Sequence, residues 1–368
     1  MRKLRIGING FGRIGRIASR IILARPDLEF VALNSRAPAS SHAYLLTYDS
    51  TYGMLHNRVR VKNGNLDIEG KTILVFAQDV PETIPWDKAG VDIVIEATGK
   101  FRTKEDLAGH LKTSRYVVLS APAKDDMQTL VLGVNEGSFI PKEDAIVSNS
   151  SCTTNCLATT LKVIHDNFKV KKGYMTTTHA VTDSQNLLDN SHSKEVRLRR
   201  ASIASLIPAS TGSAKDIGKL YKELAGRLIC QAIRVPLLTV SLLNLTVEVE
   251  KATTPEEVNR AYEKAAKEDL AGILAVAKDE LVSKDFTGNP HSSIVDPFLT
   301  KVIDGNLLNV YAWYDNEWGY TSRLIDMVTY VGREAGLVYP SYSGSQPEGA
   351  AKRIRGVYTD ADSRKRSI

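Results

Sequence analysis

The sequence has little cysteine: only three occur in 368 residues, at positions 152, 156 and 230. Three cysteines cannot form a disulfide framework, and such scarcity is typical of a reducing compartment, so we expect a cytoplasmic protein. The sequence has no Cys-x-x-Cys pair and no cluster of cysteine and histidine at zinc spacing. It therefore predicts no metal site.

Long apolar runs are absent as well, so we expect no membrane association. The chain runs from Met1 straight into a strand-like segment, without a visible secretory leader. With 43% hydrophobic and 24% charged residues, the composition is that of a globular protein long enough for two domains. A net charge of +6 suits an enzyme for anionic substrates, and would also suit weak nucleic-acid binding.

The first residues carry a nucleotide-binding pattern. Leu4 to Asn9 reads as an apolar strand, followed by Gly10-Phe-Gly-Arg-Ile-Gly15 and a helical pattern. Between a first strand and a first helix, these glycines predict a tight turn that brings a pyrophosphate to a helix N-terminus. Further strand patterns at 29–34, 91–99, 116–122 and 129–134 alternate with helical stretches. This alternation predicts a doubly wound parallel sheet.

The second strand ends in Asn34-Ser35-Arg36, where a carboxylate commonly binds the ribose hydroxyls of NAD. A carboxylate would repel a 2′-phosphate, whereas serine and arginine accept one. This ending favours NADP, although an arginine in a surface loop without a ligand would read the same way.

A polar stretch from Ser148 to Cys156 lies between an apolar strand and a helix-like segment. It places Cys152 at a predicted helix N-terminus, where free backbone N–H groups favour a thiolate and lower the cysteine pKa. Cys156 lies one turn further on among apolar residues, and we interpret it as core filler.

The second half of the chain has a different pattern. A strand ends at His179, and a long polar segment follows at 181–205. The sequence 210–213 opens another helix, either as an anion site or through N-capping by Ser210 or Thr211. Strands are predicted at 233–236, 240–250 and 310–313, and helices at 255–267 and 322–331.

From Lys3 to about Tyr339 the sequence resembles phosphorylating glyceraldehyde-3-phosphate dehydrogenase. The resemblance is carried by Asn9-Gly-Phe-Gly-Arg-Ile-Gly15, Ser151-Cys-Thr-Thr-Asn-Cys156, Arg234-Val-Pro236 and Trp313-Tyr-Asp-Asn-Glu-Trp-Gly-Tyr320. It implies an α/β fold with a Rossmann-type sheet in residues 1–151 and 316–340. It also implies an α+β catalytic domain with a largely antiparallel sheet in 152–315. Beyond the resemblance, the residues 341–368 are rich in serine, glycine, proline and charge, which predicts a flexible basic tail.

The resemblance further implies oxidation of D-glyceraldehyde 3-phosphate to 1,3-bisphosphoglycerate through a thioester, with NADP or NAD, in a homotetramer. The implied residue roles are these: Cys152 as nucleophile and His179 as base; Gly10, Gly12, Arg13, Ile14, Ser35, Arg36, Ser120 and Asn316 for the cofactor; Ser151, Thr153, Thr182, Arg197, Thr211, Gly212 and Arg234 for substrate and phosphate. Arg199 and Arg200 stay open as alternatives to Arg197.

Two other functions stay open. Erythrose-4-phosphate dehydrogenase is similar and shares the nucleophile and the histidine, but its members keep an acidic residue where this chain has Ser35. A nucleic-acid-binding or structural role through the basic loop and tail is a second alternative, and the Cys152/His179 pair argues against it as the main function. Asn190-Ser191 resembles the alanine-serine pair of photosynthetic, NADP-using members, which again favours NADP.

Overall fold

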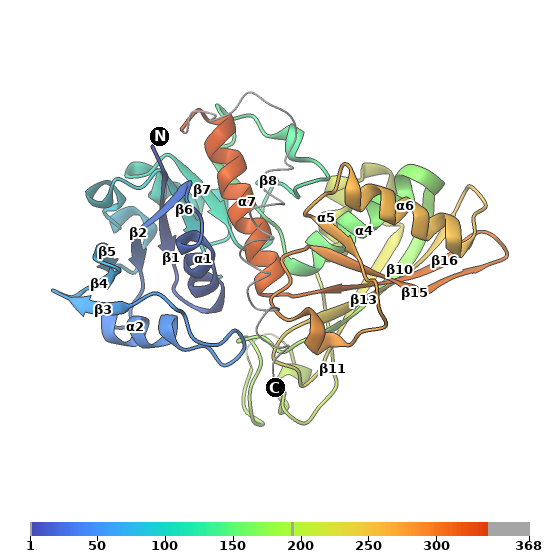
Figure 1. Cartoon of the computed structure of the whole chain (residues 1–368), viewed down its shortest axis with the longest axis horizontal. Helices are drawn as coiled ribbons and strands as arrows, with labels where there is room; N and C mark the ends of the chain where they lie inside the picture. The colour runs from blue at the N-terminus through green and yellow to red at the C-terminus, as the bar shows by residue number, and fades with distance from the viewer. Residues whose placement is uncertain (1, 193–194, 338–368) are drawn as a thin grey trace, which may run out of the picture.

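In the computed structural model the chain folds into two β-sheets with helices packed around them (Figure 1). The structure describes residues 2–192 and 195–337. The first sheet has the strand order β3-β4-β5-β2-β1-β6-β7-β9-β8. Its strands are β1 Leu4–Asn9, β2 Leu28–Asn34, β3 Val59–Lys62, β4 Asn65–Ile68, β5 Lys71–Phe76, β6 Ile93–Glu96, β7 Tyr116–Leu119, β8 Gln128–Thr129 and β9 Ile146–Ser148.

The first sheet is parallel from β5 to β8, with an antiparallel hairpin at the β3 edge. Its helices are α1 Arg13–Leu23, α2 Ala39–Thr47 and α3 Lys104–Ala108, with 3-10 turns at Pro81–Thr83, Trp86–Ala89, Gly109–Lys112 and Glu136–Ser138. The doubly wound sheet predicted from the alternation of strands and helices is confirmed. Because β1 lies between β2 and β6 and is parallel to both, the carboxyl ends of these strands lie at the same edge of the sheet as the glycine turn.

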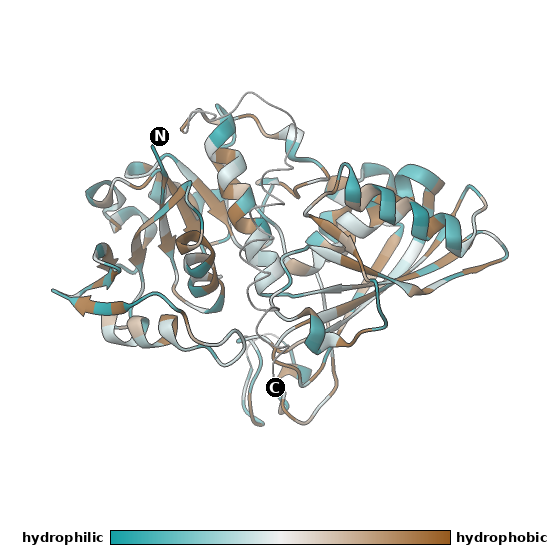
Figure 2. Cartoon of the chain, in the orientation of Figure 1, coloured by the Kyte–Doolittle hydropathy of each residue, from teal (hydrophilic) through white to brown (hydrophobic). Residues whose placement is uncertain are grey.

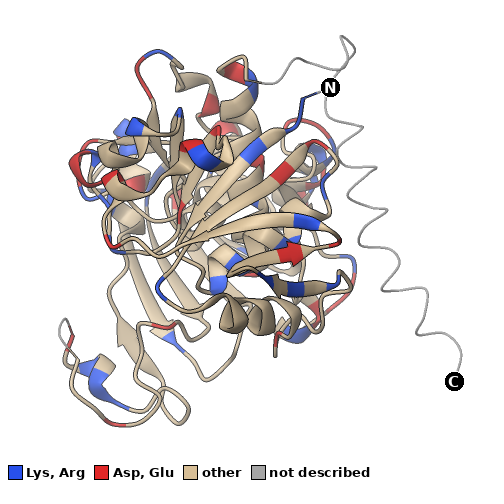
Figure 3. Ribbon diagram, turned by 90° about the vertical axis from the view of Figure 1, so that its left-hand side faces the viewer, with Lys and Arg blue, Asp and Glu red and all other residues tan. Residues whose placement is uncertain are grey.

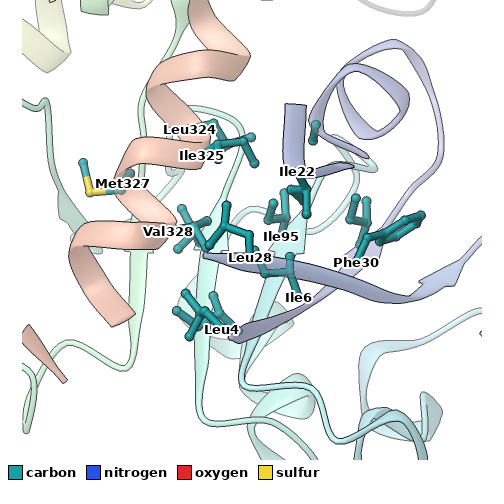
Figure 4. Packing of buried hydrophobic residues seen from close by; sticks show 14 of the residues in the cluster. Leu4, Ile6, Ile22, Leu28, Phe30, Ile95, Leu324, Ile325, Met327 and Val328 are labelled. Atoms are coloured by element: carbon teal, nitrogen blue, oxygen red, sulfur yellow. The ribbon is translucent and has the colours of Figure 1, made fainter. Parts of the chain in front are cut away.

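The last helix, α7 Trp318–Glu334, returns to the first sheet and lies between the two halves of the molecule (Figure 1). Figure 4 shows Leu324, Ile325 and Val328 directed toward Leu4 and Leu28. All five side chains are buried in one hydrophobic cluster. This packing agrees with the predicted assignment of 316–340 to the dinucleotide-binding domain, and the exact division between the domains stays a prediction.

The second sheet has the order β11-β12-β10-β13-β16-β15-β14 and is largely antiparallel, as expected. Its strands are β10 Val170–His179, β11 Ile207–Ala209, β12 Leu228–Arg234, β13 Ser241–Val249, β14 Leu274–Val276, β15 Ser293–Ile303 and β16 Leu307–Tyr314. Its helices are α4 Cys152–Phe168, α5 Ser213–Leu220 and α6 Pro255–Lys267, with 3-10 turns at Arg197–Arg199, Lys222–Leu224 and Ser283–Phe286.

Helix α6 shows why the sequence pattern works where both ends are marked. Thr254 and Glu257 form a capping box, with Pro255 at the first helical position. Val258 and Tyr262, one turn apart, are buried against the sheet, while the outer face is hydrophilic (Figure 2). The observed bounds equal the predicted 255–267.

Three predicted elements need correction. Only Thr129 of the run 129–134 is in a strand; the rest forms a turn in which Asn135 Oδ1 accepts a hydrogen bond from the Val131 amide. The predicted strand 233–236 is the end of a longer strand that stops at Arg234. Helix α7 begins four residues before the predicted 322, at Trp318. The predicted tail at 341–368 lies outside the described residues.

None of the helices in the described part of the chain is long and apolar enough to cross a membrane.

Candidate active site

The nucleophile turn joins β9 to α4, and Cys152 is the first residue of that helix as predicted. Ser151 is the N-cap, and its Oγ accepts a hydrogen bond of 3.0 Å from the Thr154 amide. Ser150 has a φ of +53°, in the left-handed region that side chains rarely adopt. This strained turn leads the chain from the buried strand directly into a helix start that carries a thiol.

The end of strand β10 brings a histidine to that thiol. His179 is the last residue of β10, is 4% exposed, and its Nε2 lies 3.4 Å from Cys152 Sγ. Its Nδ1 lies 2.7 Å from the Ala180 carbonyl oxygen and 2.6 Å from Nη1 of Arg234. The two contacts of Nδ1 require different tautomers, because Nδ1 donates to Ala180 but would accept from Arg234. In the tautomer that donates to Ala180, Nε2 carries no proton and faces the sulfur as an acceptor. Because β10 and β12 are parallel, His179 pairs with Arg234 in register.

The pKa values of this pair differ from the expectation. Loss of water around the sulfur raises the pKa of the Cys152 thiol, although the charge of Arg234 acts in the opposite direction. Burial lowers the pKa of His179 to about 3, and the Arg234 charge adds to this effect. The pair is therefore a neutral thiol beside a neutral imidazole. The predicted lowering of the Cys152 pKa at this helix start is not found, because desolvation of the sulfur outweighs the Arg234 charge and the hydrogen bonds of Thr153 and Cys152.

Tyr314 is a member of the site that sequence reasoning missed. Its hydroxyl lies 2.9 Å from Thr153 Oγ1 and 2.8 Å from Thr177 Oγ1, and its ring packs edge-on to His179. It therefore links α4, β10 and β16 behind the reacting pair. Tyr314 stands inside the motif 313–320, so the motif marked the region without indicating the contact. The buried position of Cys156, by contrast, is confirmed.

The predicted phosphate residues cluster at the start of α5. Gly212 is the N-cap, so neither Ser210 nor Thr211 occupies the cap position, but Thr211 Oγ1 accepts a hydrogen bond of 3.4 Å from the Ser213 amide. Thr211 Oγ1 also lies 3.0 Å from Ser213 Oγ, and Ser210 donates a hydrogen bond to Glu195. The first backbone N–H groups of this helix have no helical acceptor and attract an anion.

The arginines of the segment 181–205 are placed differently from Arg234. Arg197 begins a 3-10 turn and is exposed, and Arg200 forms an ion pair with Asp189 at 3.1 Å. A cleft beside the site is lined by Arg234, Ser210 and Leu198, together with Ser184, His192, Glu195 and Ala209. Arg197 does not line this cleft. Thr182 lies three residues after His179, and its Oγ1 is 2.9 Å from Ser184 Oγ.

The glycine turn between β1 and α1 is built for close backbone approach. A Cβ at Gly10 would lie 2.6 Å from the Thr98 amide nitrogen, and one at Gly15 would lie 2.2 Å from the Gly10 carbonyl oxygen. A Cβ at Gly12 would meet nothing within 4 Å, so the space before the helix is open. The first N–H groups of α1, at Arg13 and Ile14, have no acceptor within the helix and no side-chain cap. This arrangement fits a pyrophosphate.

The side chain of Arg13 is paired with carboxylates and is therefore not available to bind a pyrophosphate. It pairs with Asp49, and with Glu317 at 2.5 Å. Arg13 therefore offers its backbone N–H, while its guanidinium ties α1 to the segment before α7.

The remaining predicted cofactor residues lie at strand ends. Ser35 follows β2 and is half-buried, and Arg36 is exposed. Ser120 follows β7, and its buried Oγ makes no hydrogen bond with the part of the chain that is described. The Asn316 Oδ1 accepts a hydrogen bond of 3.0 Å from Ser241, which leaves its amide nitrogen as a donor. An unpaired hydroxyl and an oriented amide suit a polar ligand between the two sheets.

The fold and site together define a two-sheet protein with a dinucleotide-binding turn and a partly exposed cysteine in contact with a buried histidine. Residues 4–104 match the family model described as the NAD binding domain of glyceraldehyde 3-phosphate dehydrogenase, and residues 151–316 match the model of its C-terminal domain.

Curated relatives agree with the family models. The chain is 46% identical to glyceraldehyde-3-phosphate dehydrogenase of Geobacillus stearothermophilus over 89% of this chain and 98% of that protein. It is 44% identical to glyceraldehyde-3-phosphate dehydrogenase 1 of Bacillus subtilis over 90% and 99%. It is 45% identical to glyceraldehyde-3-phosphate dehydrogenase 1 of a Nostoc species over 89% and 96%. The chain belongs to the glyceraldehyde-3-phosphate dehydrogenase family.

Proposed function

We propose that this chain oxidises D-glyceraldehyde 3-phosphate to 1,3-bisphosphoglycerate with inorganic phosphate, reversibly. The observation that carries the proposal is the 3.4 Å contact between Cys152 Sγ and His179 Nε2 at the start of α4. A neutral thiol beside a neutral imidazole can pass its proton to Nε2 as the sulfur attacks an aldehyde carbon.

The residues then act in sequence. Cys152 Sγ bonds to the aldehyde carbon, and the carbonyl oxygen becomes a hydroxyl with the proton from His179. His179 next takes that hydroxyl proton as the carbon–oxygen double bond re-forms, which leaves a thioester on Cys152. The bound nicotinamide cofactor supplies the hydride acceptor for this oxidation. A phosphate oxygen then attacks the thioester carbon and the thiolate leaves, so the product is an acyl phosphate.

Backbone and side-chain donors would hold the charged groups. The amide of Cys152 at the helix start stabilises the oxygen that becomes anionic. Arg234 and Thr182, near His179, would bind the phosphate of the substrate. Ser151 and Thr153 beside the nucleophile, with Thr211 and Gly212 at the start of α5, would bind inorganic phosphate. Arg197 does not line the cleft beside Arg234, so of all these residues its proposed role in phosphate binding has the least support.

NADP is proposed to serve at least as well as NAD. The second strand ends in half-buried Ser35 and exposed Arg36, which offer a hydroxyl and a cation to a 2′-phosphate. A carboxylate in place of Ser35 would repel that phosphate. Ser35 also weakens NAD, because the two ribose hydroxyls lose their best acceptor.

A homotetramer is proposed from the surface of the segment 181–205 and its flank. Leu187 is 64% exposed and Leu206 is 70% exposed, large apolar areas for a surface in contact with water. Asn190 and Ser191 are exposed beside them and would reach the cofactor site of a neighbouring subunit. If light scattering at assay concentration gave the molar mass of a monomer, that result would contradict this assembly.

The rival functions have less support. The ribbon in Figure 3 has segments of lysine and arginine interspersed with segments of aspartate and glutamate, so basic residues do not gather on one element of the described chain. The few cysteines are typical of a reducing compartment, which supports a cytoplasmic location. The proposed reaction itself would place the enzyme in glycolysis or gluconeogenesis.

Initial rates with glyceraldehyde 3-phosphate, with and without phosphate and with NAD and NADP in turn, test the proposal. We expect turnover that requires phosphate and is at least as efficient with NADP. Faster turnover of erythrose 4-phosphate would favour the sister activity, and no turnover of either aldehyde would refute the proposal.

A further inference from the structure

A buried carboxylate lies behind the nucleophile turn. Asp216, in the first turn of α5, is 3% exposed. Its Oδ2 accepts a hydrogen bond from Ser150 Oγ and lies 3.5 Å from Thr154 Oγ1. The Ser150 carbonyl oxygen accepts a second bond of 3.0 Å from the Tyr320 hydroxyl. Ser150 is thus held on both its side chain and its backbone, in the left-handed conformation that the turn requires.

A chain of neighbouring hydroxyl groups connects this carboxylate to the proposed phosphate site. Thr154 Oγ1 lies 2.8 Å from Ser151 Oγ and 3.3 Å from Ser213 Oγ, and Ser213 lies 3.0 Å from Thr211 Oγ1. Because a carboxylate only accepts hydrogen bonds, Asp216 orients the hydroxyl donors around it.

We propose that Asp216 is a positioning residue for the phosphate-dependent step. It ties the start of α5, which carries Thr211 and Gly212, to the turn that carries Cys152. Phosphate bound at α5 must reach a thioester on Cys152, so this tie sets the distance between nucleophilic oxygen and acyl carbon. Acylation of Cys152 uses His179 and not α5, so it depends far less on the tie. This inference rests on the proposed function.

The test compares acylation with phosphate use in Asp216→Ala and Asp216→Asn. We expect Asp216→Ala to raise the KM for phosphate about tenfold, the loss of roughly one hydrogen bond to a charged group. The burst of reduced cofactor without phosphate and the KM for the aldehyde should stay within about twofold. Asp216→Asn keeps one acceptor oxygen and should change the phosphate KM by about threefold or less. A merely structural role would lower burst amplitude and turnover together.

Two further variants sharpen the result. Ser150→Ala should also raise the phosphate KM, and combining it with Asp216→Ala should add little, because the two side chains are in contact. Asp106→Ala removes an exposed first-turn carboxylate of α3 that bonds to Arg102 and Thr103 and to no site residue, so it should leave the phosphate KM unchanged.

Each outcome bears on the proposal. An unchanged phosphate KM in folded Asp216→Ala overturns it, as does a parallel loss of burst and turnover. If Asp216→Ala does not fold, unchanged phosphate KM values in both Asp216→Asn and Ser150→Ala overturn it. Absence of a burst in the wild-type enzyme would instead refute the proposed function.

Discussion

Acid should destabilise this protein partly through His179, and the size of the effect follows from its burial. Burial and the Arg234 charge lower the folded-state pKa of His179 to about 3. In the unfolded chain the imidazole has a pKa of about 6.5. The folded pKa is the lower one, so this contribution to stability is complete above pH of about 6.5 and is lost as pH falls toward 3.

The magnitude comes from proton linkage. At pH 5.5 the unfolded chain binds a proton at this position and the folded chain does not. Between pH 7.5 and 5.5 this difference lowers the free energy of unfolding by about 1.4 kcal/mol. Any folded pKa below about 4.5 gives nearly the same value, because the native imidazole is then neutral at both pH values.

The assay is urea unfolding of wild type and His179→Asn at pH 7.5 and 5.5. Asparagine does not titrate, so the variant should lose about 1.4 kcal/mol less on acidification than wild type. Other titrating groups contribute equally to both proteins and cancel in the difference. Equal acid sensitivity, within about 0.4 kcal/mol, would refute the argument that His179 is held neutral by burial.

Three further predictions concern single substitutions. Cys152→Ser should abolish nearly all oxidation while fold and cofactor binding persist, and rates near those of wild type would contradict the nucleophile assignment. Cys156→Ser should lower the free energy of unfolding by about 1 kcal/mol, because a more polar group enters a fully buried position, and kcat should be retained in the folded fraction. Ser35→Asp should shift the ratio of kcat/KM from NADP toward NAD by about one to two orders of magnitude; an unmoved ratio would remove Ser35 from cofactor choice.

The sequence predicted elements best where both ends carry local signals. The first strand and its glycine turn, and helix α6 with its capping box, have such signals. The apolar run 129–134 lacked them: Leu130 and Leu132 are buried as expected of a strand, yet the side chain of Asn135 holds this segment in a turn. Buried turns and buried strands look alike in hydropathy.

Most members of the site were predictable from the sequence, but the place of Tyr314 and the contacts between the members were not. Cys152 was predicted from its place at the start of a helix, because the signals for a helix start are local in sequence. The contact of Arg234 with His179 depends on the register of two parallel strands, which residues 55 positions apart do not reveal. The tie from Asp216 to Ser150 likewise requires α4 and α5 to be packed together before it exists.

The most direct test of the account is acylation of Cys152 in the absence of phosphate. Wild-type enzyme mixed with glyceraldehyde 3-phosphate and NADP should release about one reduced cofactor per active site and carry the acyl group on the Cys152 peptide by mass spectrometry. Phosphate should then discharge it, and His179→Asn should slow the burst by about 10²–10⁴-fold. Full turnover without an acyl group on Cys152, or an equal burst in Cys152→Ser, would contradict the account.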